Sequence, residues 1–175
     1  MKSISLKQEL EENCSKQNVL QLARIAASNP SFIDEIFSLT EDDSFKKNWL
    51  AAWILDHLNQ IEPEALLPYL NRMTLYLPST KNEAIQRTYL KIISTHTLPK
   101  NNEGILMDTC FNLLNKPATA VAVRVWCMDI LTQFTERYPE IKHELKPILE
   151  SVAQTGTAGE KNRALKKLKI LDKES

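Results

Sequence analysis

Apolar side chains recur every three or four residues along most of the chain, which is the spacing that places them on one face of an α-helix. Prolines and short polar runs interrupt this pattern, and a proline does so because its ring pushes the preceding residue out of the α region. The pattern therefore predicts an all-helical protein. The expected helices cover residues 6–27, 31–39, 45–60, 63–76, 82–95, 103–115, 118–138, 139–154 and 160–172, and the first of them is either continuous or broken near residues 13–15.

Four stretches of the chain align with one another at spacings of 40, 37 and 39 residues. Each stretch begins with a cation and places a bulky apolar side chain two residues later. They are Lys47–Ile54, Arg87–Ile93, Arg124–Leu131 and Arg163–Ile170. This period indicates a stacked array of two-helix units, because one such unit cannot bury its own apolar face.

A second alignment supports the array. Residues 54–64 resemble residues 130–140, which lie 76 residues later and so two repeat units further on. Pro68 and Pro147 fall inside expected helices, and each is expected to kink its helix. We therefore expect one domain over residues 1–175, with about four to five helix pairs.

Composition narrows the choice of function. Hydrophobic residues make up 43% of the chain and charged residues 25%, as in ordinary globular proteins. Only three glycines occur, which nearly excludes glycine-rich phosphate loops. No run of 18 apolar residues exists, so no membrane span is expected. The charged residues Lys2, Lys7 and Glu9 interrupt the first ten residues before a signal-peptide core can form.

The cysteines favour a reducing compartment. Cys14, Cys110 and Cys127 lie far apart within apolar helical patterns. An odd number of cysteines without a CxxC pair predicts free thiols that act as small buried hydrophobic residues. The expected location is cytoplasmic.

Charge is divided unevenly although the formal net charge is zero. Residues 1–64 carry six Lys and Arg against eleven Asp and Glu, which gives −5, and residues 65–175 carry sixteen against eleven, which gives +5. The last expected helix, 160–172, is the most basic segment. Such a chain could attract partners of either sign. A solvated terminal cap, which helical arrays need for solubility, is the simpler interpretation of the basic helix.

No motif for catalysis or metal binding is present. His57, His96 and His143 lie 39 and 47 residues apart, and no HExxH motif accompanies them. Zinc needs three or four converging ligands, which this spacing does not provide. Nucleophile elbows, P-loops and GxGxxG loops are also missing from the sequence. We therefore expect no catalytic residue, no metal and no cofactor.

The repeated cations and bulky residues are the candidate binding residues. We call them the cation–aromatic set: Lys47, Trp49, Arg87, Tyr89, Arg124, Trp126 and Arg163. Aromatic rings beside Arg or Lys form good binding surfaces, because both groups offer a large contact area. A large side chain at one position of every repeat also fills the core between repeats, so both interpretations stay open.

The four aligned stretches, the prolines inside helices and the repeated cation resemble HEAT-like repeat proteins. This resemblance implies an all-α, right-handed α-α superhelix, or solenoid, whose second helices line a concave face. It also implies that an Asp of one repeat pairs with the Arg of the next. Here the cations recur regularly but the Asp does not, so the cations are either exposed or paired with other groups.

A partial likeness extends to the HEAT-like DNA-alkylation-repair glycosylases, which grip DNA with Trp, Asp and Arg of concave helices. Arg124, Trp126 and Asp129 resemble that set, as do Trp53 and Asp56. The family separates its Trp and Asp by four residues, whereas both pairs here are separated by three. The chain is also neutral overall, and duplex DNA needs several cations on one face.

The preferred prediction is a non-catalytic scaffold that binds a protein or peptide along its concave face. The ligand is expected to be acidic if the cations of the set are exposed. DNA binding with glycosylase-like activity is the alternative, and nucleic acid is the less favoured partner. A structural role within a larger assembly, through the apolar ends of the array, is the third possibility.

Overall fold

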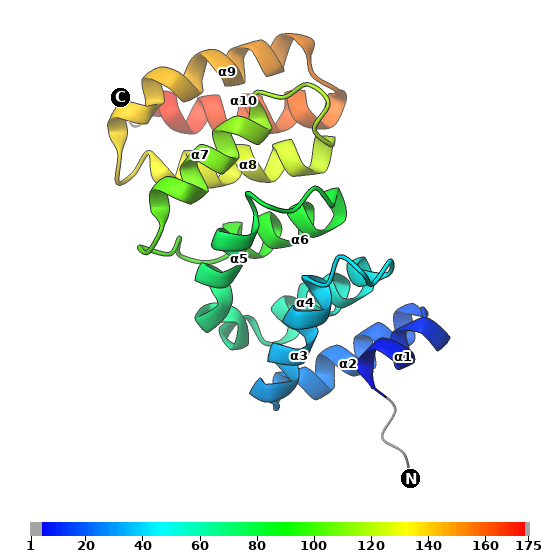
Figure 1. Ribbon diagram of the computed structural model, residues 1–175. Helices are drawn as coiled ribbons and strands as arrows, with labels where there is room; N and C mark the ends of the chain where they lie inside the picture. The colour runs from blue at the N-terminus through cyan, green and yellow to red at the C-terminus, as the bar shows by residue number, and fades with distance from the viewer. Residues whose placement is uncertain (1–4, 174–175) are drawn as a thin grey trace. The chain divides into compact units, whose positions relative to one another are not determined.

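The computed structural model describes residues 5–173, and all regular structure in this part of the chain is helical (Figure 1). The all-α prediction is confirmed. The α-helices are α1 (Leu6–Glu12), α2 (Lys16–Ala27), α3 (Pro30–Thr40), α4 (Asn48–Ile61), α5 (Leu70–Tyr76), α6 (Glu83–Ser94), α7 (Glu103–Leu114), α8 (Val121–Phe134), α9 (Lys142–Thr155) and α10 (Ala158–Lys173). Two 3-10 helices, η1 (Pro63–Tyr69) and η2 (Pro139–Ile141), lie between them.

The helices gather into two compact units, one ending at Leu70 and the other beginning at Asn71. In the first unit, α4 packs against α2, α3 and η1. Its buried face carries Leu50, Ile54 and Leu58, each with no exposed surface. The ring of Phe37 stacks on that of Tyr69 at 4.7 Å, which fixes α3 against η1. Burial of these side chains, about 1.5–3 kcal/mol each, holds the unit together.

The second unit has two layers. Helices α6, α8 and α10 pack side by side in chain order, while α7 packs on α8 and α9 packs on α10 (Figure 1). Two hydrogen bonds show that α6 and α8 run parallel. At the start of the two helices, the N–H of Ala120 donates to the side chain of Glu83. At their ends, the side chain of Gln133 donates to the carbonyl oxygen of Ser94. This is the arrangement that stacked helix pairs produce.

The sequence repeat lies on the second helix of each pair. Its four copies fall on α4, α6, α8 and α10, as the alignment predicts. The helix starts are less regular than the sequence suggests. Residues before α4 form a turn in which Asp42 accepts hydrogen bonds from Ser44, and α4 begins only at Asn48.

Helix α1, the first described element, packs within the first unit. Ser5 caps α1 and Ser15 caps α2, and both hydroxyls accept a backbone N–H of the first turn. Leu6 and Leu10 of α1 are buried. Within residues 5–173, no helix combines the length and apolar character needed to span a bilayer.

Candidate functional site

Lys47 is the first cation of the cation–aromatic set, and it is tied to its own unit. Its Nζ atom donates to the carbonyl oxygen of Glu11 over 3.1 Å and lies 3.1 Å from the Sγ atom of Cys14. Cys14 is exposed, so the prediction that all three cysteines are buried is wrong at this position. Cys14 lies in the short connection between α1 and α2, where its thiol donates to the carbonyl oxygen of Leu10 over 3.3 Å. Lys47 therefore stabilises the connection between α1 and α2.

Trp49 is the most accessible aromatic residue of the set, with 42% of its surface exposed. Its ring stacks on that of Trp53, one helical turn further along α4, with 6.4 Å between the ring centroids. Trp53 in turn lies 5.5 Å from the ring of His57. The first unit thus presents an aromatic stripe along α4.

Arg87 and Tyr89 lie on α6 and have opposite environments. The Arg87 side chain is exposed and forms no hydrogen bond or ion pair within the described residues. Tyr89 has no exposed surface, and its ring meets that of Tyr76 edge-on at 6.0 Å. Tyr89 therefore fills the core between helices, and we exclude it from the candidate surface.

Arg124 of α8 joins two neighbouring repeats. Its Nε atom donates to the carbonyl oxygen of Leu114 over 3.2 Å, and its Nη1 atom forms an ion pair with Glu160 of α10. Only 15% of the Arg124 side chain and 3% of the Glu160 side chain are exposed. Arg124 is thus a structural cation rather than an open one.

Glu160 is held as a carboxylate by its neighbours. It accepts the N–H of Thr157 at 2.8 Å and the Thr157 hydroxyl at 2.7 Å, and its own N–H approaches that hydroxyl at 3.5 Å. This is a capping box at the start of α10. Burial raises the pKa of Glu160, but the hydrogen bonds from Thr157 and the charge of Arg124 outweigh it and bring that pKa below its usual value.

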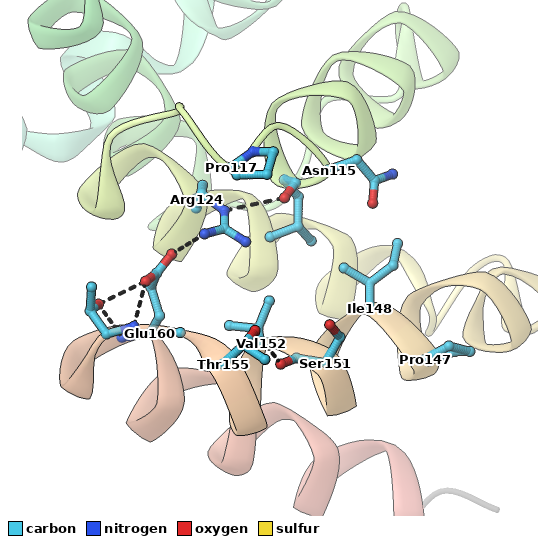
Figure 2. A pocket seen from close by; sticks show the side chains of 12 residues that line it. Asn115, Pro117, Arg124, Pro147, Ile148, Ser151, Val152, Thr155 and Glu160 are labelled. Atoms are coloured by element: carbon cyan, nitrogen blue, oxygen red, sulfur yellow. Dashed lines mark hydrogen bonds and ion pairs between the residues drawn. The ribbon is translucent and has the colours of Figure 1, made fainter.

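A groove of about 560 Å³ opens beside this ion pair (Figure 2). The connection between α7 and α8 forms one wall and α9 forms the other. Figure 2 shows Pro117 and Asn115 facing Ile148, Val152 and Ser151 across the opening, with Arg124 and Glu160 at one end. Because Glu160 neutralises Arg124, the groove offers a mixed surface of low net charge.

Asp129 is the centre of a second ion cluster between α8 and α10. Its two oxygens are each 2.6 Å from a cation, Oδ2 from Arg163 and Oδ1 from Lys167. The Arg163 guanidinium also lies 5.4 Å above the ring of Trp126. One buried carboxylate therefore faces two cations, and the cluster keeps a positive charge beside an aromatic ring.

The structure thus brings together only some of the predicted residues. Trp126 and Arg163 meet on neighbouring second helices, and Asp129 supplies the inter-repeat carboxylate that the resemblance implies. Sequence reasoning did not single out Glu160 or Lys167. For Glu160 a signal was available, because Thr157 precedes it by three residues as a capping box requires.

The remaining cysteines are structural. Cys110 and Cys127 are free and buried. Burial, followed by a hydrogen bond with Cys127, raises the pKa of the Cys110 thiol well above its usual value. Across residues 5–173, no group of three or more His, Cys, Asp and Glu side chains is placed to hold a metal ion.

Paired helices whose second members pack side by side define an α-helical repeat protein. Comparison with known families agrees, because the HEAT repeat domain matches residues 6–167. The chain belongs to the HEAT repeat family, and its fold is that of an α-solenoid. No curated protein and no solved structure matches it.

Proposed function

We propose that this HEAT repeat protein is a non-catalytic scaffold that binds an acidic segment of a protein or peptide. The binding surface is the face formed by α8 and α10, with Trp126, Arg163 and Lys167 as its contacts. Arg87 on the adjoining α6 extends the positive charge. The observation that carries the proposal is the excess of cations around Asp129.

The charge balance of this face explains the preference for an acidic ligand. Asp129 compensates only one of its two partners, so the cluster of Asp129, Arg163 and Lys167 has a net charge of +1. A carboxylate of the ligand could form an ion pair with Arg163 or Lys167 while Asp129 keeps its own contacts. The desolvation cost for Arg163 would be small, because its side chain is one-third exposed. Electrostatic attraction of this kind gives selectivity and a faster association more than raw affinity.

Trp126 supplies the apolar part of the contact. Its ring is half-buried and holds the Arg163 guanidinium against one face. Val125 lies one helical turn before Asp129 on α8, and Val121, one turn earlier still, is exposed. A ligand that alternates acidic and apolar side chains would therefore match the surface.

Two observations favour a binding role over the glycosylase-like alternative. Asp129 is buried and already bonded to two cations, so it is poorly suited to act as an open catalytic base. Arg124, the second residue of that resemblance, is occupied by Glu160 and by Leu114. A cytoplasmic location belongs to the same proposal, and the free cysteines support it.

Selection from a random-peptide display library tests the proposal. The protein should enrich peptides of net negative charge that carry apolar residues, and enrichment should fall when Arg87→Gln and Lys167→Gln are combined. Lys100→Gln, an exposed lysine outside the α8–α10 face, is the matched control. Enrichment of neutral or basic peptides, or an unchanged selection with the double variant, would contradict the proposed surface.

A further inference from the structure

The last helix presents a basic face that no part of its own unit covers. Helix α10 packs against α8 and α9, and its opposite side is open. Lys166, Lys169 and Lys173 are exposed there, and none forms an ion pair within residues 5–173. Leu165 and Ile170 border these lysines and are 51% and 39% exposed. At 3.6 residues per turn, these five residues lie on one side of the helix.

The first unit carries a groove of opposite charge. It has a volume of about 470 Å³ and is formed by α1, α2 and α3. Leu22, Ile25 and Phe32 form apolar lining, and Glu9 and Glu35 are its charged residues. Among the residues that the structure describes, no cation lines the groove, and neither carboxylate forms an ion pair.

The two surfaces therefore complement each other in sign and in pattern. One is a helix face with three lysines bordered by two apolar side chains, and the other is an apolar groove with two glutamates that form no ion pair with the rest of residues 5–173. The division of charge along the chain favours the same pairing. The unit that contains the groove has a net charge of −5, and the unit that contains α10 has +5.

We propose that the groove of α1–α3 receives α10 of a second copy of this chain. Lys166 and Lys169 pair with Glu9 and Glu35, while Leu165 and Ile170 cover apolar surface around Ile25. Because the two contacting patches differ, the contact is heterologous, and it leaves one groove and one α10 face free to bind further copies. This association is separate from the peptide-binding proposal, since Arg163 and Lys167 are turned toward Asp129 instead.

Charge-swapped variants test the pairing by sedimentation velocity at low salt. The wild-type chain of 20.0 kDa should gain weight-average mass as its concentration rises, and should lose this gain at roughly 0.5 M salt because the ion pairs are screened. Variant A (Lys166→Glu with Lys169→Glu) and variant B (Glu9→Lys with Glu35→Lys) should each remain monomeric. An equimolar mixture of A and B should associate again, because every groove then meets an α10 face of opposite charge.

The control is Lys100→Glu with Lys116→Glu, which changes the net charge as variant A does at exposed sites away from α10. It should associate like the wild type, because it keeps both the acidic groove and the basic α10 face, whereas variant A alone should stay monomeric. Circular dichroism establishes that each variant is folded. A wild-type chain that stays monomeric, or a mixture of A and B that stays monomeric, overturns the proposal. Loss of binding to anionic phosphatidylserine vesicles in variant A, without any self-association of the wild type, would assign the α10 face to a membrane surface instead.

Discussion

Arg163 of α10 donates to the Oδ2 atom of Asp129 of α8 over 2.6 Å, and so joins the second helix of one repeat to the second helix of the next. Arg124 makes the reverse connection, from α8 to Glu160 of α10. The two ion pairs cross the same helix–helix contact in opposite directions. They fix the register of α8 and α10, and that register places the Arg163 guanidinium over the ring of Trp126.

Asp129→Asn removes the charge that Arg163 and Lys167 share. We expect the free energy of unfolding to fall by about 1–3 kcal/mol, because the charge-assisted hydrogen bond from Arg163 and the ion pair with Lys167 are both weakened while the two cations can still reach water. Urea denaturation followed by circular dichroism measures the change. Asp108→Asn, at an exposed aspartate of α7, is the control and should stay within about 0.5 kcal/mol of the wild type. Equal effects of the two substitutions would contradict a structural role for Asp129.

Glu160 should make stability depend on pH. Its pKa in the folded protein is lower than its usual value of 4.5. The stabilisation from this group is therefore fully present above that value and is lost as the pH falls through the lower, folded pKa. Glu160→Gln should be less stable than the wild type at pH 7, and the difference should shrink toward pH 3. Urea unfolding over this range measures it, and a difference that does not change with pH would show that Glu160 contributes no linked charge.

Gly156 ends α9 and Gly159 lies in the first turn of α10, so the two glycines form a matched pair. A Cβ atom at Gly156 would lie 2.7 Å from the carbonyl oxygen of Val152 and 3.1 Å from the Cβ atom of Glu160, whereas nothing lies within 4 Å at Gly159. Gly156→Ala should destabilise the protein by about 1–3 kcal/mol through overpacking. Gly159→Ala should stabilise it by about 0.5–1 kcal/mol, because alanine favours the helix. Thermal unfolding compares them, and the opposite order would refute the packing described for Gly156.

The three thiols should react at different rates. Cys14 is exposed, whereas Cys110 and Cys127 are buried and the pKa of Cys110 is raised, chiefly by burial. Titration of the native protein with a thiol-specific disulfide reagent should therefore modify one thiol quickly and the other two only after unfolding. Cys14→Ser should abolish the fast reaction. Fast modification of two or three thiols in the native state would mean that α7 and α8 open readily.

The sequence was sufficient for the fold because the repeat period and the helical pattern are set by local spacing. The second helices lie where the alignment of Lys47, Arg87, Arg124 and Arg163 places them. The single domain over residues 1–175 stays a prediction, although the family match extends across both compact units.

The candidate site was less predictable, because equivalent positions of the repeat have different neighbours. Arg87 is exposed, whereas Arg124 is neutralised by Glu160, a residue 36 positions away. Tyr89 aligns with Trp49 and Trp126, yet it is buried where they are partly exposed. Such differences depend on the helix that packs against each residue, which a single sequence does not specify.

The residue that caps α6 is also difficult to predict from the sequence. Thr80 and Glu83 match the pattern of a capping box before α6, but Asn82 caps the helix by accepting the N–H groups of Ala84 and Ile85. The Thr80 hydroxyl accepts the N–H of Asn82 instead. Thr80 and Asn82 could both cap this helix, and Asn82, which directly precedes the helix, is the residue that does so.

The most direct test of the central claim compares two labelled ligands by fluorescence anisotropy at physiological salt. One is an acidic peptide that alternates Glu and Leu, and the other is duplex DNA with an abasic site. We expect the peptide to bind, and we expect Lys167→Gln to weaken this binding roughly fivefold, as for the loss of one partly exposed charge, while Lys100→Gln leaves it unchanged. Tight binding of the abasic duplex, with no binding of the peptide, would contradict the proposed scaffold and favour a DNA-repair role for the same face.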